Sequence, residues 1–368
     1  GNPGVSLHTL LFSAQAHDVL SNMPEVIAGI LGITITVVAI IVELASNRYT
    51  PRVTELFVRT PINLIVLGFF VVTGLLCIWI SYIGASADFV PRVGTISAFF
   101  AITVCMLVLL PYFAFVFAFL DPHNIIQHMG LSVMKAIRKG RRGDMHRRRR
   151  ARFAAVRGIE QLSDVALNAI EKKDKGICMH AIDTLGNLSQ DYLAIKAEMP
   201  DDWFGLEDAL KENPDFVALQ TDALGDIQEG RIWFEMKVMR QYQMLYGETL
   251  NRMRDINYLI AINTRKVAEA SLDLQQEQTT GLMTKFFNTF LRATVNGRDV
   301  RTAYNVLHQY RLFAETSLKR GRYDLAVEAT KRFKYYGQLG FNMGLPFVLE
   351  TAAYDLCALN ELAYDLNV

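Results

Sequence analysis

The sequence is poor in cysteine and contains no recognised catalytic motif. Its four cysteines have no CxxC spacing and no obvious partners, so they are expected to be reduced and mostly buried. This pattern excludes a secreted fold built on disulfides. The chain also lacks G-x-x-x-x-G-K-[ST], G-x-G-x-x-G after a strand, H-E-x-x-H and G-x-S-x-G. We therefore expect a protein that is not an enzyme, with no catalytic residue, no bound metal and no cofactor.

Positive charge is absent before Arg48, so the N-terminus lacks the basic start of a secretory signal. Long uncharged runs are present instead, at Val26–Val42, Ile62–Ala87 and Val93–Leu120. Each reaches or nearly reaches the roughly 20 residues that cross a hydrocarbon core of about 30 Å. Three such runs in succession predict a transmembrane domain. We place its limits at residues 24–134, its spans at about 24–44, 61–84 and 93–120, and an outer interfacial segment at 1–23.

Loop charges predict the orientation of these spans. The loop Ser46–Thr60 carries three arginines and one acid, whereas Gly84–Arg92 carries one base and one acid. Many bases follow Leu120. Basic loops stay in the cytoplasm, so we expect the first loop and everything after the third span to be cytoplasmic, with the N-terminus outside.

The first cytoplasmic loop contains a predicted polar cluster. Thr-Pro pairs at 50–51 and 60–61 are helix-start signals and predict a short interfacial helix over about 51–59. Glu43 lies at the inner edge of the first span, where an acid is costly unless it is paired. Either it forms a structural ion pair that pins the loop, or it takes part in ion conduction or proton relay. The cluster comprises Glu43, Arg48, Tyr49, Thr50, Pro51, Arg52 and Asn63.

A family resemblance starts in this loop. The run ELASNRYTPRVTELFVRTPINLIVLGFFVVTGLLC resembles the signature region of a family of bacterial predicted membrane proteins of unknown function. A second stretch, QLSDVALNAIEKKDKGICMHAIDTLGNL, is similar to that family's cytoplasmic helix–turn–helix. Family members usually have more spans and an Asn-Asp-Pro turn, whereas here the turn is Lys173-Asp174-Lys175-Gly176. The resemblance implies a bacterial inner-membrane protein and no particular activity. The matching signature positions are Leu44, Ala45, Ser46, Tyr49, Thr50, Pro51, Arg52, Phe57 and Arg59.

A strongly basic stretch follows the third span, and we call residues 135–157 the basic collar. It holds eleven bases and one acid, whereas the remainder from Gly158 holds 23 bases and 30 acids. Such clusters bind anionic lipid headgroups, at about 1 kcal/mol per base near the surface. Alternatively, the collar contacts the acidic domain of a neighbouring subunit or lines the inner mouth of a ring and attracts anions. No base-stacking module accompanies it, so nucleic acid is not expected. The contact candidates are Arg138, Lys139, Arg141, Arg142, Arg147, Arg148, Arg149 and Arg150.

Residues 158–368 are predicted to form a helical cytoplasmic domain, because apolar residues recur at spacings of three and four. If Arg231–Leu274 is one helix, it is about 65 Å long and needs packing along its length, either within the chain or against another subunit. Residues 301–341 resemble one tetratricopeptide-type hairpin, which suits protein contacts. The expected helices are 151–172, 176–197, 204–212, 217–276 (interrupted), 280–295, 299–319, 323–341 and 346–366. The oligomer-contact candidates are Ile232, Met236, Met239, Tyr246 and Met253.

Together these features predict an all-α membrane protein, with three transmembrane helices followed by a large helical domain built as a bundle or hairpin stack. The leading hypothesis is a homo-oligomer in the bacterial inner membrane that forms a channel-like path for ions or small solutes. Three helices enclose no path alone, so this hypothesis requires association. The alternative is a non-catalytic scaffold or accessory subunit that docks protein partners or a larger membrane complex. The expected partners are anionic membrane lipids, further copies of the chain and a protein on the cytoplasmic helices.

Overall fold

The structure is a computed structural model that describes residues 14–48, 57, 60–86, 92–119, 121–206 and 208–368. Every regular element within these ranges is a helix, which confirms the predicted all-α class. By its internal contacts the chain divides into two compact units, Gly1–Ile125 and Ile126–Val368.

Unit 1 contains three helices, α2 (Ala14–Arg48), α4 (Pro61–Ser86) and α5 (Arg92–Phe119). Each includes a segment long and apolar enough to cross a bilayer, at Asn22–Leu44, Pro61–Ile83 and Val93–Phe119. This confirms the three predicted spans. Residues 14–23, part of the predicted outer interfacial segment, form the first turns of the continuous α2. The rest of that expected segment, residues 1–13, lies outside the described residues.

The helices of unit 1 share a narrow core. Helix α4 packs against both α2 and α5, and Ile27, Phe70, Cys77 and Cys105 are among the side chains buried between them. Most other apolar side chains of these helices point outward, as Leu64 does with 64% exposure. An apolar surface this continuous is unfavourable in water and is the surface that a hydrocarbon environment accommodates.

The start of α4 follows the predicted Thr-Pro signal. The backbone amide of Asn63 donates a hydrogen bond to the Thr60 carbonyl (3.1 Å), and the helix begins at Pro61. The Asn63 side chain donates a second hydrogen bond to the Phe57 carbonyl. The Phe57 ring meets the Phe119 ring edge-on, with centroids 5.5 Å apart. Apart from Phe57, the interfacial helix predicted over 51–59 lies outside the described residues.

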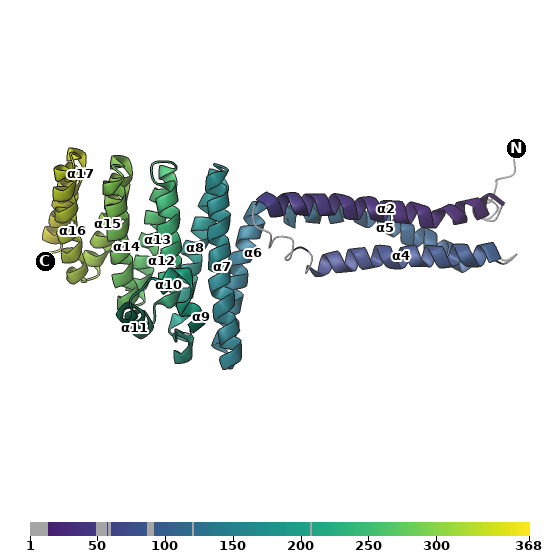
Figure 1. The fold of residues 1–368 in the computed structure, drawn as a ribbon, viewed down its shortest axis with the longest axis horizontal. Helices are drawn as coiled ribbons and strands as arrows, with labels where there is room; N and C mark the ends of the chain where they lie inside the picture. The colour runs from purple at the N-terminus through teal and green to yellow at the C-terminus, as the bar shows by residue number, and fades with distance from the viewer. Residues whose placement is uncertain (1–13, 49–56, 58–59, 87–91, 120, 207) are drawn as a thin grey trace. The chain divides into compact units, whose positions relative to one another are not determined.

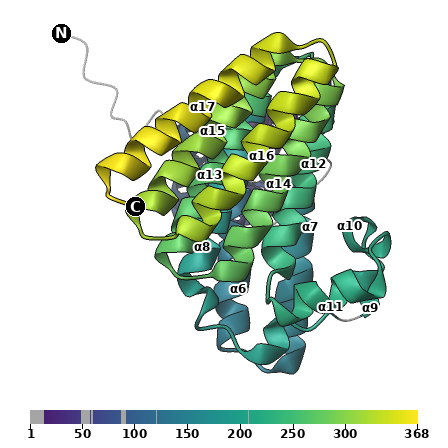
Figure 2. The same cartoon turned by 90° about the vertical axis from the view of Figure 1, so that its left-hand side faces the viewer.

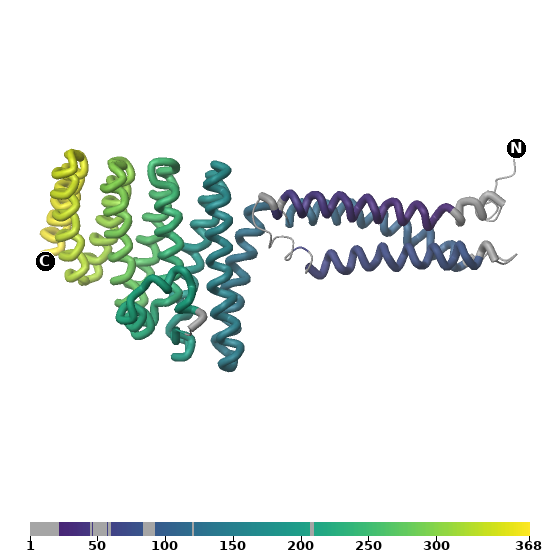
Figure 3. The backbone as a smooth tube through the Cα atoms, in the orientation of Figure 1, coloured from purple at the N-terminus to yellow at the C-terminus, as the bar shows by residue number. Residues whose placement is uncertain are grey.

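Unit 2 is a stack of antiparallel helix pairs (Figures 1 and 3). Each pair packs on the next in the order α7–α8, α12–α13, α14–α15 and α16–α17, with α6 before the first pair. The bounds are α6 (Pro122–Arg141), α7 (Met145–Glu171), α8 (Lys175–Lys196), α12 (Trp233–Thr249), α13 (Arg254–Asp273), α14 (Glu277–Asn296), α15 (Val300–Lys319), α16 (Tyr323–Asn342) and α17 (Pro346–Asp365). The short elements η1 (Asp201–Trp203), α9 (Asp208–Lys211), α10 (Pro214–Val217) and α11 (Thr221–Glu229) lie to one side of the stack (Figure 2).

The last five helices repeat with a strict period. Each has 20 residues, and they begin at residues 254, 277, 300, 323 and 346, so every helix and its turn take 23 residues. The middle residue of each three-residue turn between them has a positive φ: Gln275 (54°), Arg298 (53°), Gly321 (74°) and Gly344 (73°). A left-handed residue just past a helix reverses the chain sharply. The single hairpin seen in the sequence is therefore part of a regular hairpin stack.

The segment Arg231–Leu274 does not form one long helix. It breaks between α12 and α13, which are antiparallel neighbours joined at 250–253. Asn251 adopts φ 63°, and its side-chain amide donates to the Gly297 carbonyl (3.1 Å) in the adjacent turn. One interruption expected within 217–276 therefore falls at 250–253, and the length of about 65 Å, which required a single continuous helix, does not apply. The chain folds this apolar seam back on itself and buries most of it.

Candidate functional site

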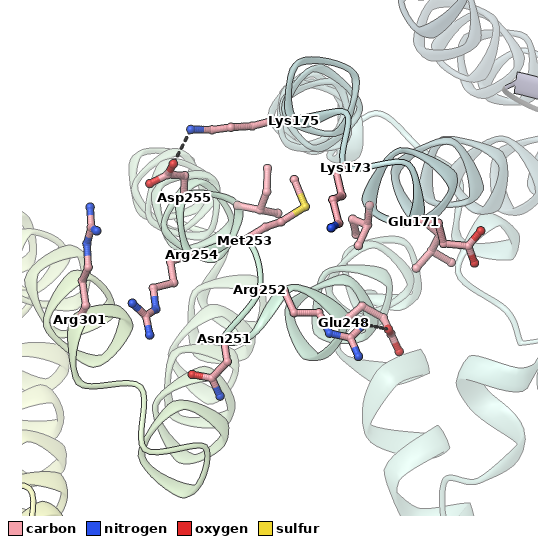
Figure 4. Close-up of a pocket in the computed structure, with 13 residues that line it drawn as sticks. Glu171, Lys173, Lys175, Glu248, Asn251, Arg252, Met253, Arg254, Asp255 and Arg301 are labelled. Carbon is pink, nitrogen blue, oxygen red and sulfur yellow. Dashed lines mark hydrogen bonds and ion pairs between the residues drawn. The ribbon is translucent and has the colours of Figure 1, made fainter.

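A large cavity of unit 2 opens at the tips of two hairpins. It is formed by the α7–α8 turn, the α12–α13 turn and the first turn of α15, and its volume is about 1220 Å³. We call it the hairpin-tip cleft (Figure 4). Its lining residues are Leu167, Ile170, Glu171, Lys173, Lys175, Glu248, Asn251, Arg252, Met253, Arg254, Asp255, Ile256 and Arg301.

Charged side chains of the cleft are only partly paired. Lys175 forms an ion pair with Asp255. The hydrogen bond from Lys175, with further attraction from Lys175 and Arg301, holds the pKa of the Asp255 carboxyl below its usual range. Arg252 lies 3.8 Å from Glu248, one helical turn away. These contacts neutralise two of the five bases that line the cleft.

A third base, Arg254, is held by a carboxylate outside the cleft lining. Its Nε lies 2.9 Å from the Asp299 carboxylate, and Asp299 is buried and also caps α15 by accepting from the Thr302 amide. This contact joins the α12–α13 turn to the α14–α15 turn, so the two hairpin tips have a fixed spacing.

Lys173 and Arg301 have no carboxylate within salt-bridge distance among the described residues. In Figure 4 Lys173 extends toward the side of Met253 and Arg252, whereas the Glu171 carboxylate points away from them. The apolar side chains Leu167, Ile170 and Ile256 lie among these charges in the same lining. The cleft thus combines an apolar wall with two bases, Lys173 and Arg301, that form no salt bridge among the described residues, which suits an anionic ligand that also carries apolar groups.

Sequence reasoning did not identify this cleft. Its residues come from three stretches separated by about 80 and 50 positions, and each stretch alone looks like an ordinary charged turn. The signal in the sequence is the Lys173-Asp174-Lys175-Gly176 turn, which departs from the Asn-Asp-Pro turn of the family that the sequence resembles. Its backbone explains its position at the tip, because Lys173 has φ 57° and Asp174 caps α8 by accepting from the Ile177 amide.

The predicted intramembrane cluster is only partly described. Glu43 is exposed on α2, and Asn63 is buried in α4. Asn63 bonds to the Phe57 carbonyl, and its Oδ1 atom is buried without a hydrogen-bond partner in the described part of the chain. The Tyr112 hydroxyl in α5 is likewise buried without a hydrogen-bond partner among the described residues. Arg48 ends α2, while Tyr49, Thr50, Pro51 and Arg52 lie outside the described residues.

The basic collar divides between structural and exposed side chains. Arg141 pairs with Glu198, and Arg148 pairs with Asp202 (2.6 Å). Arg152 is buried and donates to the carbonyls of Asp202 (2.9 Å) and Gly205 (2.6 Å). These three arginines hold the segment that follows α8. The other predicted contact residues are exposed near the α6–α7 turn: Arg138, Lys139, Arg142, Arg147, Arg149 and Arg150.

The residues expected at an oligomer contact lie mainly inside unit 2. Ile232, Met239 and Tyr246 are buried against the chain's own helices, and Met236 is half-buried. Tyr246, for example, stacks on Phe290 with ring centroids 4.6 Å apart. Met253 is half-buried and lines the hairpin-tip cleft. Intramolecular packing therefore occupies most of this seam.

A buried charge cluster fastens α7 to α12 beside the short elements. The Lys237 ammonium is buried, lies 2.6 Å from the Glu160 carboxylate and also pairs with Asp215. Burial, with the nearby Glu160 charge, raises the pKa of Asp164. Because both carboxylates pair with Lys237, we interpret this cluster as a structural anchor for the segment around α10.

Comparison with known proteins assigns the N-terminal part of the chain. Residues 4–157 match the family described as "Predicted membrane protein (DUF2254)". The match includes the signature region between the first and second spans and ends before the helix–turn–helix likeness at 159–188. No curated protein and no solved structure matches the chain.

Proposed function

We propose that this chain, whose residues 4–157 match a family of predicted membrane proteins, is a non-catalytic scaffold that docks an acidic segment of a partner protein in the hairpin-tip cleft. Its three spans anchor it in the bacterial inner membrane. The loop charges favour an outside N-terminus and a cytoplasmic unit 2. Scaffolding replaces conduction as the leading hypothesis, because the Met-rich seam and Arg141 and Arg148 are engaged within the chain.

The observation that carries this proposal is the positive charge of Lys173 and Arg301, which form no salt bridge among the described residues, beside an apolar wall. Stacked helix pairs present extended surfaces that are widely used to bind other proteins. The cleft volume of about 1220 Å³ also exceeds the roughly 300–1,000 Å³ typical of small-molecule pockets. An extended segment with alternating acidic and apolar side chains would place its carboxylates near the two bases and its apolar groups against the apolar wall.

The proposal is tested by peptide binding to the full chain in detergent. The probe is a fluorescent peptide of alternating glutamate and leucine, measured by anisotropy against a lysine–leucine peptide of equal length. We expect the acidic peptide to bind, and K173E/R301E to weaken it about tenfold or more. Lys285→Glu/Arg332→Glu on exposed helix surfaces makes the same charge change outside the cleft and should preserve binding. Equal binding of both peptides, or no effect of K173E/R301E, would contradict the proposal.

The second candidate is a homo-oligomeric path for ions or small solutes. It is favoured by the Asn63 Oδ1 atom and the Tyr112 hydroxyl, which are buried without hydrogen-bond partners among the described residues of apolar spans. Polar groups at membrane depth are costly and are often functional. Reconstituted vesicles should then release a trapped ion faster than empty vesicles, and Tyr112→Phe or Asn63→Leu should slow that release. Release equal to that of empty vesicles would reject this candidate.

A further inference from the structure

The tip of the α6–α7 hairpin carries an excess of positive charge. Asp144 is the only acid between Pro122 and Ile159, and its carboxylate caps α7 by accepting from the Arg147 backbone amide (2.8 Å). The two helices pack closely beside this turn, since a Cβ on Gly140 would lie 2.9 Å from the Ala151 Cβ. Five exposed bases at the tip form no salt bridge among the described residues: Arg138, Lys139, Arg142, Arg147 and Arg150.

Large apolar side chains project among these bases. Met145 is 66% exposed and Phe153 is 48% exposed. Arg149 and Arg157 are also exposed, and each lies one helical turn from Phe153 on the same side of α7. Helices that lie in a membrane interface combine bases, which contact headgroups, with apolar side chains that enter the headgroup–acyl boundary. We call the five bases together with Met145 and Phe153 the collar tip.

The stability of α7 does not explain the arginines at its start. The N-terminal end of a helix carries a partial positive charge, so bases in the first turns are unfavourable there. The first turn of α7 contains no acid that compensates them. Arg147 and Arg150 point away from the core, whereas Ala151 and Ala155 are the buried side chains of these turns. An anionic surface outside the protein would compensate the exposed charge.

We propose that the collar tip is a peripheral docking site for the surface of an anionic lipid bilayer, with Met145 and Phe153 inserted among the headgroups. The exposed bases contact the phosphates, and the two apolar side chains leave water. The inference adds apolar insertion by two named residues to the headgroup contact expected for the arginines. It goes beyond the docking of a partner in the hairpin-tip cleft and uses none of the cleft residues.

Chain connectivity keeps a bilayer within reach of the collar tip. The third span ends with α5 at Phe119, and α6 begins at Pro122. Helix α6 has 20 residues and is therefore about 30 Å long at 1.5 Å per residue. A site tethered this closely has a high effective concentration at the membrane, so individually weak contacts are enough to dock it.

The first test measures how deeply the collar tip enters the bilayer. The full chain is reconstituted in lipid nanodiscs and carries an environment-sensitive dye at His146→Cys, which is exposed at the tip and leaves its bases and apolar residues intact. Cys357→Ser removes the exposed native thiol, since Cys77, Cys105 and Cys178 are buried. The quencher is bromine on the lipid acyl chains, and the discs contain either phosphatidylglycerol or phosphatidylcholine alone.

We expect quenching at position 146 to be about threefold or more stronger with phosphatidylglycerol than with phosphatidylcholine. About 1 M salt should remove this difference, because the Debye length is then about 3 Å. The matched control is the same dye at Lys285→Cys, exposed on α14, which should not be quenched in either disc. No quenching at 146, equal quenching at 146 and 285, or no dependence on lipid charge would overturn the proposal.

The second test changes the collar tip in the labelled chain. Each base near an anionic surface strengthens attachment about fivefold, so R142E/R147E should weaken docking by on the order of 20-fold or more and abolish quenching. Lys331→Glu/Lys334→Glu makes the same charge change on the exposed side of α16 and should preserve quenching. Undiminished quenching in R142E/R147E would overturn the electrostatic part of the proposal.

The apolar part is tested at Phe153. Phe153→Ser should reduce quenching at 146 by half or more without changing any charge, whereas Phe153→Trp should retain it. If Phe153→Ser has no effect, the ring does not insert and the proposal fails. Phe153 is exposed, so this comparison remains decisive if R142E/R147E loses its helical circular dichroism. The cleft variant K173E/R301E should leave quenching unchanged, which separates this inference from the proposed docking function.

Discussion

The Lys196 ammonium lies 2.5 Å from the Glu235 carboxylate, and both side chains are buried where α8, α12 and α14 meet. The Lys196 ammonium also donates to the Thr279 hydroxyl (3.0 Å), which in turn donates to Glu235 (3.0 Å). The second Glu235 oxygen is buried and has no hydrogen-bond partner in the part of the chain that the structure describes. One cation therefore compensates a buried carboxylate whose remaining contacts are few.

Removal of this cation should destabilise unit 2 strongly. Lys196→Met leaves Glu235 charged and unpaired in the interior, so we expect the free energy of unfolding to fall by about 3–5 kcal/mol. The double variant K196M/E235Q removes both charges and should recover most of that loss. Denaturant unfolding of the full chain, followed by circular dichroism, measures both. If the double variant is no more stable than K196M, the pair does not act through charge compensation.

Helix glycines should differ in the sign of their response to alanine. A Cβ on Gly186 would lie 2.4 Å from the Asn263 Oδ1 atom, so Gly186→Ala requires α8 or α13 to shift and should cost about 1–3 kcal/mol. Gly281 in α14 has nothing within 4 Å of the same position. Gly281→Ala should instead stabilise by about 0.5–1 kcal/mol, because glycine is a poor helix former. The midpoint of thermal unfolding distinguishes the two signs, and a rise for Gly186→Ala would refute the close contact.

The repeated turns predict stability changes of opposite sign for two substitutions at equivalent positions. Arg298 occupies with φ 53° the turn position that Gly321 occupies with φ 74° one repeat later. A left-handed conformation costs a residue with a Cβ about 1 kcal/mol relative to glycine. Arg298→Gly should therefore stabilise the protein by up to about 1 kcal/mol, and Gly321→Ala should destabilise it by a similar amount. Denaturant midpoints test both variants, and changes of the same sign would show that backbone strain does not decide these positions.

The Asp355 carboxyl should make stability depend on pH. Burial raises its pKa to about 6, with Arg311, 3.0 Å away, opposing the shift. In the unfolded chain its pKa is about 3.9, so between roughly pH 4 and 6 the folded state holds the proton and the unfolded state does not. Stability contributed by this group is therefore lost as pH rises through that window, on the order of 1–2 kcal/mol. Asp355→Asn should flatten the profile from pH 4 to 6, and an unchanged profile would contradict this assignment.

The arginines of the basic collar should fall into two groups, one that binds lipid headgroups and one that stabilises the fold. Arg142→Ala/Arg147→Ala removes exposed charges and should reduce the anionic lipid that stays bound to the purified protein, with little change in stability. Arg141→Ala/Arg148→Ala breaks the contacts to Glu198 and Asp202 and should mainly lower stability. Native mass spectrometry measures bound phosphatidylglycerol, and unfolding measures stability. Identical lipid retention in wild type and the first variant would argue against headgroup binding.

Much of the architecture is encoded locally. The predicted Thr60-Pro61 start places the beginning of α4 at Pro61, and the expected helices 299–319 and 323–341 match α15 and α16 to within a residue. Helix starts and apolar periods depend on neighbours in the sequence, and a length near 20 apolar residues defines a span. These features therefore required no knowledge of distant contacts.

The break after α12 shows the limit of that reasoning. No proline or glycine stands at 250–253, and the turn is stabilised by the hydrogen bond from Asn251 to Gly297. A partner 46 residues away leaves no mark on the local pattern. The Met-rich seam thus looked like a surface for another subunit, although the fold back at Asn251 buries Met239 and Tyr246 within the chain.

The sequence by itself determined the three spans, the helical character and the limits of several helices, because backbone propensity and apolar spacing act over a few residues. Only the tertiary structure decided which charged side chains form ion pairs and which are buried. It paired Arg148 with Asp202, buried Lys196 beside Glu235, and brought Lys173 and Arg301 to one cleft without a salt bridge to any described residue. Ion pairing depends on distance in space and on burial, and only the packing of the helix pairs sets those two quantities.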